Sequence, residues 1–268
     1  MRLYAIAVYL FLYIPIAIIA LFSFSAGRNA SEFAGFSVKW YGKALSNPFV
    51  TDALKTSVTV ALSSAIIAAV FGTMAALALQ GMKGRLKTLF DALIYIAVMI
   101  PGIVIGISTL IALVTVFGWI NPLLTAIFPA PAPQLHLGLL SLIAAHSLFN
   151  MALVIVIVRA RIAGMDRSFI EASADLYATP FGTFRQVTLP LILPGILAGF
   201  LLSFTFSFDD FIIAFFVAGS NTTLPIYVFS SIRRGVTPEI NAIGTMVLTL
   251  SLILLITAQS FLQRGRKS

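Results

Sequence analysis

The sequence predicts an all-α integral membrane protein with six transmembrane helices. Of its 268 residues, 60% are hydrophobic and only 10% are charged, whereas a soluble domain carries about 25% charged residues. The mean hydropathy of +1.05 indicates the same class of protein. Apolar runs of about 20 residues, the length that crosses a bilayer as a helix, recur along the chain. These six runs cover residues 3–25, 54–79, 89–117, 136–158, 191–218 and 241–262.

The first apolar run, residues 3–25, is longer than the apolar core of a signal peptide, which has roughly 7–15 residues. We therefore expect a retained transmembrane helix, with cleavage near the small residues Ser23 and Ser25 as the alternative. The segments between the later runs are short, and none has the size of a soluble domain. We therefore expect residues 1–268 to form a single transmembrane domain.

Lysine and arginine are distributed unevenly between the two alternating sets of connecting segments. One set carries eleven of these residues and the other carries six. The richer set consists of Arg2, Lys83, Arg85, Lys87, Arg159, Arg161, Arg167, Arg185, Arg264, Arg266 and Lys267. Because cytoplasmic segments carry the excess of basic residues, we expect both termini in the cytoplasm. The net charge of +8 is then a topology signal, and we expect no nucleic-acid partner because the basic residues are dispersed.

The sequence lacks the residue patterns of an enzyme. It contains no cysteine, so it can form neither a disulfide nor a thiolate metal site. The glycine- and lysine-containing stretch GMKGRLKT, residues 81–88, has the wrong spacing for a phosphate-binding loop. Neither a nucleophile elbow nor a metal-ligand pattern is present. We therefore expect no catalytic residues, no metal and no cofactor in this chain.

Two short segments predict close packing between helices. PGIVIG, residues 101–106, and PGILAG, residues 194–199, each place two glycines four residues apart directly after a proline. Small residues at this spacing let helix backbones approach closely in a membrane. We expect a packing role for both segments.

The longest polar segment between two spans, residues 159–190, predicts two short helices. Ser168 with Glu171 three residues later fits a capping box, and Thr179 followed by Pro180 fits the start of a second helix. Apolar residues recur at helical spacing at Met165, Phe169, Ala172 and Leu176. Such an amphipathic elbow is either a surface loop that lies on the membrane or on its own bundle, or a docking element for a cytosolic partner.

Two adjacent acids, Asp209 and Asp210, lie in the apolar stretch SFTFSFDDFIIAFF, residues 203–216. A carboxylate is costly in such surroundings unless it is compensated. If the fifth run is one helix with about 100° per residue, Asp210 lies on a small, polar face and Asp209 lies at its flank. The polar face comprises Gly199, Ser203, Ser207, Asp210, Ala214 and Val217. The opposite face comprises Phe200, Phe204, Phe208, Phe211 and Phe215.

These acids have two interpretations. They attract a cation on a translocation path, with Ser203 and Ser207 beside them, or they serve as a buried helix cap or as a salt bridge to another helix. Arg233 and Arg234 are candidate partners that would neutralise them. For His146, in AAHSLFN, we expect a hydrogen bond between helices, with a role in the pathway as the alternative.

The segment EASADLYATPFGTFRQVTLPLILPG resembles the EAA loop of permease subunits from ABC importers. The residues that fit the motif are Glu171, Ala172, Asp175, Leu176, Ala178, Phe184, Val187, Leu189 and Pro190. Ser173 replaces the second alanine of the motif. Tyr177 stands where the family usually has glycine, the residue best suited to a left-handed helix end.

Further stretches resemble the second permease of spermidine/putrescine-type importers: LYIPIAIIALFSFS, GFSVKWY, SFDDFIIAFFVAGS and TTLPIYVFSSIRRGVTPEINAIGT. The resemblance implies a type I ABC importer permease fold in the bacterial inner membrane, and import of polyamine-type cations driven by ATP. It implies a sister permease in a heterodimer, two cytosolic ATPase subunits that bind ATP and magnesium, and an extracytoplasmic binding protein. It assigns these residues to the ATPase-coupling loop: Glu171, Ala172, Ser173, Asp175, Leu176, Tyr177 and Phe184.

Three alternatives remain open at this point. The chain could serve an importer of the same class with a different small substrate. It could be a secondary transporter coupled to an ion gradient, which would need no docking elbow and for which internal repeats are not evident. It could also be a membrane scaffold or sensor that transports nothing.

Overall fold

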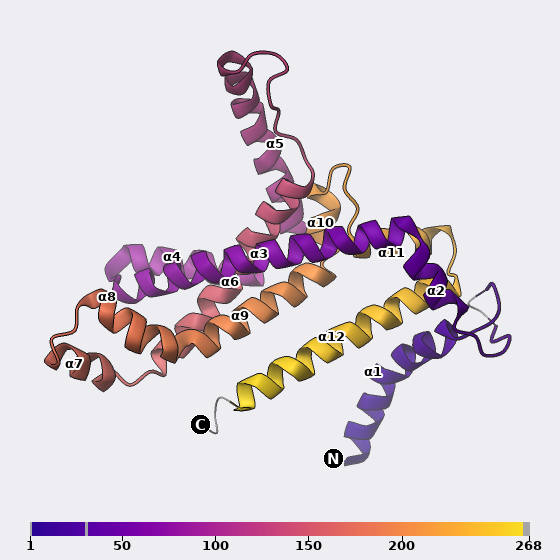
Figure 1. Cartoon of the computed structure of the whole chain (residues 1–268), viewed down its shortest axis with the longest axis horizontal. Coiled ribbons are helices and arrows are strands. Elements are labelled where there is room, and N and C mark those ends of the chain that lie inside the picture. The colour runs from indigo at the N-terminus through magenta and orange to yellow at the C-terminus, as the bar shows by residue number, and fades with distance from the viewer. Residues whose placement is uncertain (1, 30–31, 265–268) are drawn as a thin grey trace. The chain divides into compact units, whose positions relative to one another are not determined.

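The structure of the chain, a computed structural model, describes residues 2–29 and 32–264 (Figure 1). Arg266 and Lys267, which contribute to the charge asymmetry, lie outside the described residues. The described chain is almost entirely helical, and its β pairing is limited to an isolated bridge between Ser25 and Phe36. The chain divides into two compact units. Unit 1 comprises Met1–Lys55 and Thr222–Ser268, and unit 2 comprises Thr56–Asn221. The prediction of a single permease domain stays a prediction.

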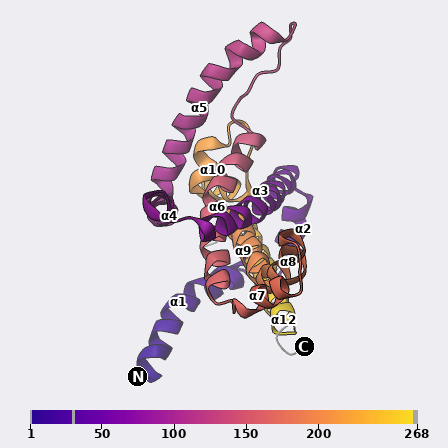
Figure 2. The same ribbon diagram turned by 90° about the vertical axis from the view of Figure 1, so that its left-hand side faces the viewer.

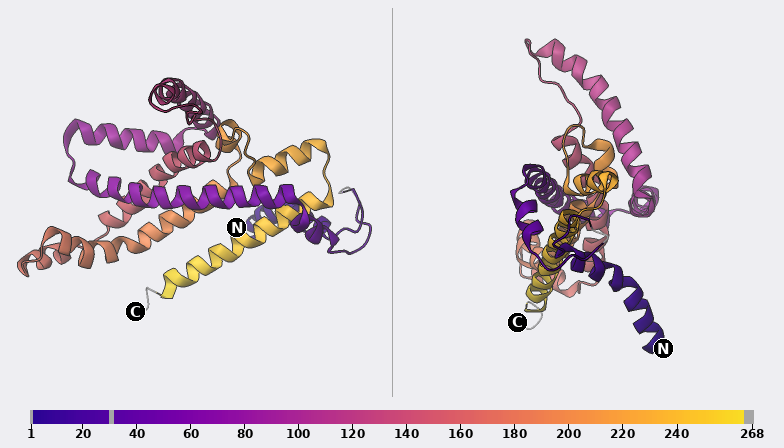
Figure 3. Two further views of the ribbon diagram at one scale, coloured as in Figure 1. Left: turned by 45° about the horizontal axis from the view of Figure 1, so that its top comes forward. Right: turned by 90° about the vertical axis from the view of Figure 1, so that its right-hand side faces the viewer.

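Unit 1 is built around α12 (Pro238–Arg264), which packs against α1 (Arg2–Ser23) and the short α2 (Lys39–Ser46). α1 and α12 lie close together near α2 and separate towards their outer ends (Figures 1 and 3). The unit also contains the first turns of α3 (Pro48–Gly81) and α11 (Leu224–Arg234). α2 and α11 were not predicted from the sequence. Both helices are too short and too polar to be recognised as transmembrane spans.

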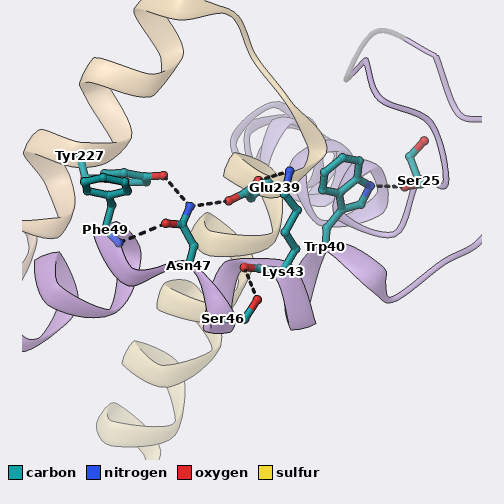
Figure 4. A network of polar contacts seen from close by, with 8 residues as sticks. All are labelled: Ser25, Trp40, Lys43, Ser46, Asn47, Phe49, Tyr227 and Glu239. Carbon is teal, nitrogen blue, oxygen red and sulfur yellow. Dashed lines mark hydrogen bonds and ion pairs between the residues drawn. The ribbon is translucent and has the colours of Figure 1, made fainter.

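A polar network joins α2, the start of α3, α11 and α12 in unit 1 (Figure 4). Asn47 is its centre. Its side-chain amide Nδ2 donates to Tyr227 Oη at 3.3 Å and to Glu239 Oε1 at 3.1 Å. Its Oδ1 accepts the backbone N–H of Phe49 at 3.1 Å and so caps α3. Glu239 Oε2 also pairs with Lys43 Nζ at 3.0 Å. The Asn47 side chain thus makes hydrogen bonds to the first turns of three helices, α3, α11 and α12.

We expect Asn47→Ala to lower the melting temperature of the purified protein. The change removes a helix cap and two side-chain hydrogen bonds, which together correspond to about 1–2 kcal/mol of unfolding free energy. Ser46→Ala is the matched control, because the Ser46 hydroxyl makes an exposed hydrogen bond to the Lys43 carbonyl. Equal melting temperatures for the two variants would show that the network contributes nothing to stability.

Unit 2 contains the rest of α3 and every helix up to Val217. These helices are α4 (Gly84–Met99), α5 (Gly102–Ile127), α6 (Leu139–Ala163), α7 (Ser168–Asp175), α8 (Pro180–Thr183), the π-helical turn η1 (Phe184–Thr188), α9 (Leu189–Asp209) and α10 (Ile212–Val217). α6 packs along α9 and also contacts α4 and α10. The core between these helices includes Leu79, Val154, Val158 and Ile192, all buried. α5 packs on α10, and its later turns extend away from α6 and α9 (Figure 2).

The membrane character of the fold is confirmed. Five described helices are long and apolar enough to span a bilayer, and the apolar part of α12, Pro238–Ile253, is a shorter sixth. The five are Tyr4–Ser23, Pro48–Gly81, Gly102–Ile127, Leu139–Ala163 and Pro180–Asp209. They correspond to five of the six predicted runs, and α12 corresponds to the last.

The prediction that residues 89–117 form one transmembrane helix is wrong, because two helices cover this range. α4 ends at Met99 and α5 begins at Gly102. Ile100 between them has an extended backbone, with ψ at 136°. The reason is Pro101, because proline disfavours helical geometry in the residue that precedes it.

The prediction that residues 191–218 form one transmembrane helix is also wrong, because the helix breaks within this range. The helix starts earlier, at Pro180, and runs through η1 into α9. It ends at Asp209, because Asp210 is extended with φ −71° and ψ 121°. The Asp210 carboxylate accepts the backbone N–H of Ala214 at 2.9 Å. A short polar side chain that satisfies nearby backbone donors in this way competes with helix continuation.

Both glycine pairs have the predicted packing role. A Cβ on Gly106 would lie 2.7 Å from Phe216 Cδ2, so this glycine lets α5 approach α10 closely. A Cβ on Gly195 would lie 3.0 Å from Arg161 Cβ, and one on Gly199 would lie 3.4 Å from Val154 Cγ2. The second pair therefore brings α9 against α6.

Candidate functional site

The elbow between α6 and α9 has a defined turn at the end of α7. The backbone N–H of Tyr177 donates to the carbonyl of Ala174 at 2.9 Å, and that of Ala178 donates to the carbonyl of Ser173 at 3.1 Å. This pair of bonds is the Schellman arrangement of a helix end. The Schellman arrangement requires a left-handed backbone at this position, and Tyr177 adopts it with φ at 56°. The turn suited to glycine is therefore kept, although the residue is tyrosine.

We expect Tyr177→Gly to preserve the elbow and Tyr177→Val to loosen it. A left-handed backbone costs a residue with a Cβ about 1–2 kcal/mol, and a β-branched side chain fits it worst. Hydrogen–deuterium exchange of the amides in residues 168–178 measures the effect. Exchange in the glycine variant should match or fall below wild type, and exchange in the valine variant should rise. Faster exchange in the glycine variant than in the valine variant would contradict the turn geometry.

The start of α7 differs from the prediction. Ser168 is not the N-cap of a capping box with Glu171, because it is already the first helical residue. The residue that satisfies its backbone N–H is Asp166, whose Oδ1 accepts it at 2.9 Å. Hydrogen bonds from Ser168 lower the pKa of the Asp166 carboxyl. A carboxylate two residues upstream thus takes the place expected for the serine hydroxyl, and Glu171 is exposed in the first turn.

The second half of the elbow is as expected and is continuous with a span. Thr179 caps α8 by accepting the backbone N–H of Gly182 at 3.1 Å, with Pro180 as the first helical residue. The hydroxyls of Ser173 and Thr183 lie 2.9 Å apart and tie α7 to α8. α8, η1 and α9 form one continuous helix, so this hydrogen bond ties α7 to a helix that is long and apolar enough to span a membrane.

Most residues predicted for the coupling loop are exposed. Leu176 is 82% exposed and Tyr177 is 96% exposed, although both are large and apolar. Glu171, Ala172 and Asp175 are also exposed, whereas Ser173 and Phe184 are half-buried. α7 has no buried residue and makes its main contacts with α8 and η1. Its surface combines apolar and acidic side chains that the described chain does not cover.

A second group of predicted residues meets inside unit 2 in a polar cluster. His146 Nδ1 of α6 lies 2.7 Å from Ser207 Oγ of α9, and Ser64 Oγ of α3 donates to the same oxygen at 3.0 Å. If Ser207 accepts from Ser64, its own hydroxyl donates to Nδ1, and the histidine proton is on Nε2. Nε2 faces Asp210 Oδ2 at 3.6 Å. The histidine thus lies between the serines and the acid, and its Nε2 has no hydrogen-bond partner in the described chain.

Three members of the polar cluster, His146, Ser207 and Asp210, line a cavity of about 210 Å³. The other lining residues are Val98, Ile100, Gly102, Phe149, Asn150, Phe206 and Ile213. Asn150 is one helical turn beyond His146 on α6, and it is only 1% exposed. Neither its amide oxygen nor its amide nitrogen has a hydrogen-bond partner in the described chain. Since such a buried group costs about 1–3 kcal/mol when unsatisfied, the cavity is suited to a polar occupant.

The two acids have different positions. Asp210 has a side chain that is 22% exposed and lines the cavity. Asp209 is exposed and lies outside this cavity, in a wider hollow of about 470 Å³ that both acids share. Asp210 accepts the backbone N–H of Ala214 in the first turn of α10, as a helix cap would. Its role on a substrate path stays a prediction, as does that of Asp209.

The predicted polar face of the fifth run is the buried side of the helices, even though the helix breaks. Ser203, Ser207, Ala214 and Val217 are all buried. Ser203 lies outside the cavity, and its hydroxyl has no partner in the described chain. The opposite face is less uniform than expected, because Phe208 is buried at 4% exposure.

Sequence reasoning missed Ser64 and Asn150. The spacing of His146 and Asn150, four residues apart in an apolar span, places both on one helix face and was the available signal. Ser64 gave no comparable signal, because its role depends on how α3 packs against α9. The hydrogen bond expected for His146 is confirmed.

Comparisons with known proteins agree on the class of protein. The chain is 38% identical to the putrescine transport system permease protein PotI of Escherichia coli (strain K12), over 89% of this chain and 82% of that protein. It is 35% identical to the spermidine/putrescine transport system permease protein PotC of the same strain, over 94% and 90%.

A solved bacterial ABC transporter involved in the import of the acidic polysaccharide alginate has a similar fold. The TM-score is 0.75 at 16% sequence identity, and the match covers 98% of this chain and 94% of that one. The fold is therefore that of a type I ABC importer permease. Residues 68–265 match the family described as "Binding-protein-dependent transport system inner membrane component". The chain belongs to this family of inner-membrane permease subunits.

Proposed function

We propose that this chain is the transmembrane permease subunit of an ABC importer that moves polyamine-type organic cations into the cytoplasm. The observation that carries the proposal is its 35–38% identity, over most of its length, to permeases named for putrescine and for spermidine/putrescine. The acid in the cavity of unit 2 supports the same substrate class, because amines of this kind carry ammonium groups.

The proposed complex contains four further subunits. They are a sister permease, two cytosolic ATPase subunits that bind ATP and magnesium, and an extracytoplasmic substrate-binding protein. This chain would itself catalyse no reaction. The excess of lysine and arginine on one set of connecting segments supports an orientation with both termini in the cytoplasm.

In the coupling step, α7 would dock on an ATPase subunit. Three features support this role: exposed apolar side chains on α7, the Ser173–Thr183 hydrogen bond, and the continuity of α8, η1 and α9. A short helix held in this way transmits a rigid-body motion that a flexible loop would absorb. Closure of the ATPase subunits would then shift α9, which carries Ser207 and ends at Asp209.

In the membrane, the cavity of unit 2 would hold one ammonium group of the cargo. Asp210 would supply the opposite charge and Asn150 Oδ1 a second acceptor, while the backbone N–H of Ala214 holds the carboxylate in place. Apolar side chains such as Phe149 and Phe206 line the same cavity and would contact the methylene chain. The Asp210 carboxylate remains partly hydrated, because its side chain is not fully buried.

We expect Asn150→Leu to stabilise the protein and to impair transport. Leucine has the same branched shape at Cγ, and the adjoining cavity leaves room for its larger volume. It removes the unsatisfied amide, which corresponds to a gain of about 1–3 kcal/mol. The same change removes an acceptor from the cavity. Melting temperature and the initial rate of uptake by the reconstituted complex measure the two effects. A variant that is more stable and fully active would exclude Asn150 from the path.

The substrate class is tested by competition. Uptake of radiolabelled putrescine by cells that express the complete importer should be reduced by excess spermidine, and hardly by an uncharged diol of equal length. Inhibition by the diol as strong as that by spermidine would contradict a polyamine substrate. It would leave the importer assignment, which rests on the family match, in place.

A further inference from the structure

A basic pocket of about 250 Å³ lies in unit 2, where α3 and α6 end and α4 begins. Three cationic side chains line it: Lys87 of α4, Arg159 of α6 and Arg167, which directly precedes α7. None of its lining residues is acidic. The remaining lining residues are Ala76, Leu79, Gln80, Ile162, Ala163 and Met165.

The positive charge of this basic pocket is only partly compensated. Arg159 pairs with Asp91 across α4 and α6. Within the part of the chain that the structure describes, Lys87 and Arg167 make no ion pair. The nearest acid in sequence, Asp166, uses its carboxylate to cap α7. Lys87, which is half-buried, and Arg167, which is exposed, thus line a hollow whose other lining residues are apolar apart from Gln80 and Arg159. An anion in such a hollow would be held more strongly than on an open surface.

We propose that the basic pocket binds the phosphate group of an anionic membrane phospholipid. Lysine and arginine are the side chains that recognise phosphate, and basic pockets between spanning helices are a known setting for lipid headgroups. The pocket lies at the ends of two spans, α3 and α6. Apolar walls such as Leu79 and Ile162 suit the start of an acyl chain, whereas a free phosphate would use only the cations.

Because the pocket lies beside the start of α7, a bound lipid would restrain the elbow between α6 and α9. Arg167 directly precedes the first residue of α7, and Arg159 lies in the last turns of α6. A phosphate that bridges Lys87 of α4 and Arg167 would hold the start of α7 against α4. This role is separate from the proposed cation path, because the pocket shares no lining residue with the cavity at Asp210.

The test measures lipid retention by native mass spectrometry on the purified protein with the subunits that co-purify. Samples are equilibrated with phosphatidylglycerol or with phosphatidylcholine. We expect wild type to retain phosphatidylglycerol selectively, and Lys87→Gln combined with Arg167→Gln to weaken retention about thirtyfold. Lys83→Gln removes an exposed cation outside the pocket and should change retention less than about twofold. Lys87→Arg combined with Arg167→Lys keeps both charges and should keep the lipid.

Equal retention by wild type and the glutamine variant, at equal melting temperature, would overturn the proposal. Equal retention of phosphatidylcholine and phosphatidylglycerol by wild type would also overturn it. A third arm adds inorganic phosphate in large excess. Persistence of the phosphatidylglycerol adduct supports the lipid as the source, and its replacement by bound phosphate would overturn that assignment.

Discussion

Glu171→Ala should abolish most ATP-driven uptake while leaving the complex assembled. Glu171 is an exposed acid in the first turn of α7, beside apolar side chains that are open to a partner. It does not serve as the side-chain cap of its own helix, so its removal should leave α7 folded. A hot-spot contact at a protein interface contributes about 2 kcal/mol or more. If this contact is made in the closed, coupled state and the other docking contacts hold the ATPase in place, its loss lowers uptake about thirtyfold. Initial uptake rates and co-purified ATPase subunits are the two measurements.

The matched control is Glu32→Ala, which removes an exposed acid between α1 and α2. It should leave the coupling between ATP hydrolysis and uptake unchanged. Normal uptake in Glu171→Ala would contradict a coupling role for this residue. Loss of uptake together with loss of the ATPase subunits would assign Glu171 to assembly rather than to transmission of motion. A scaffold or sensor that transports nothing would show no uptake in wild type.

Asp210→Asn should impair transport far more than Asp209→Asn. Asparagine keeps an oxygen that can accept the Ala214 N–H, so α10 stays capped while the charge is lost. A hydrogen bond to a charged group contributes about 1.5–3 kcal/mol, so we expect uptake to fall about tenfold or more. Asp209 is exposed and lies outside the cavity, so its substitution should change uptake less than about threefold.

Asp210→Ala separates the two roles of this side chain. Alanine removes both the charge and the cap of α10, so the melting temperature should fall as well as the uptake rate. If Asp210→Asn transports normally and only Asp210→Ala fails, the acid is a helix cap and not a cation site. If both asparagine variants transport normally, neither acid belongs to the path.

The sequence predicted the membrane class, the helical segments and the elbow, because these depend on local composition and spacing. It also predicted which face of the fifth run is buried, since small and large side chains alternate there with helical period. Thr179 and Pro180 gave the start of α8 correctly, because a cap is a contact within one turn.

The sequence did not predict the helix breaks, and the reasons are specific. Apolar residues continue on both sides of Pro101 and of the acids at 209 and 210, so hydropathy averaged over a span-length window does not reveal either break. At Asp210 the break depends on a bond to Ala214 four residues ahead. The polar cluster needs Ser64, His146 and Ser207 from three helices. Their approach is set by packing between distant segments and not by any local pattern.

This chain should import its substrate only when a partner subunit hydrolyses ATP. The direct measurement is putrescine accumulation in proteoliposomes that contain the permease pair and the binding protein, with and without the ATPase subunits and ATP. Putrescine should accumulate against a gradient only in the presence of the ATPase subunits and ATP, and collapsing the ion gradients should have no effect. Accumulation without the ATPase subunits, driven by an ion gradient, would contradict this prediction and establish a secondary transporter.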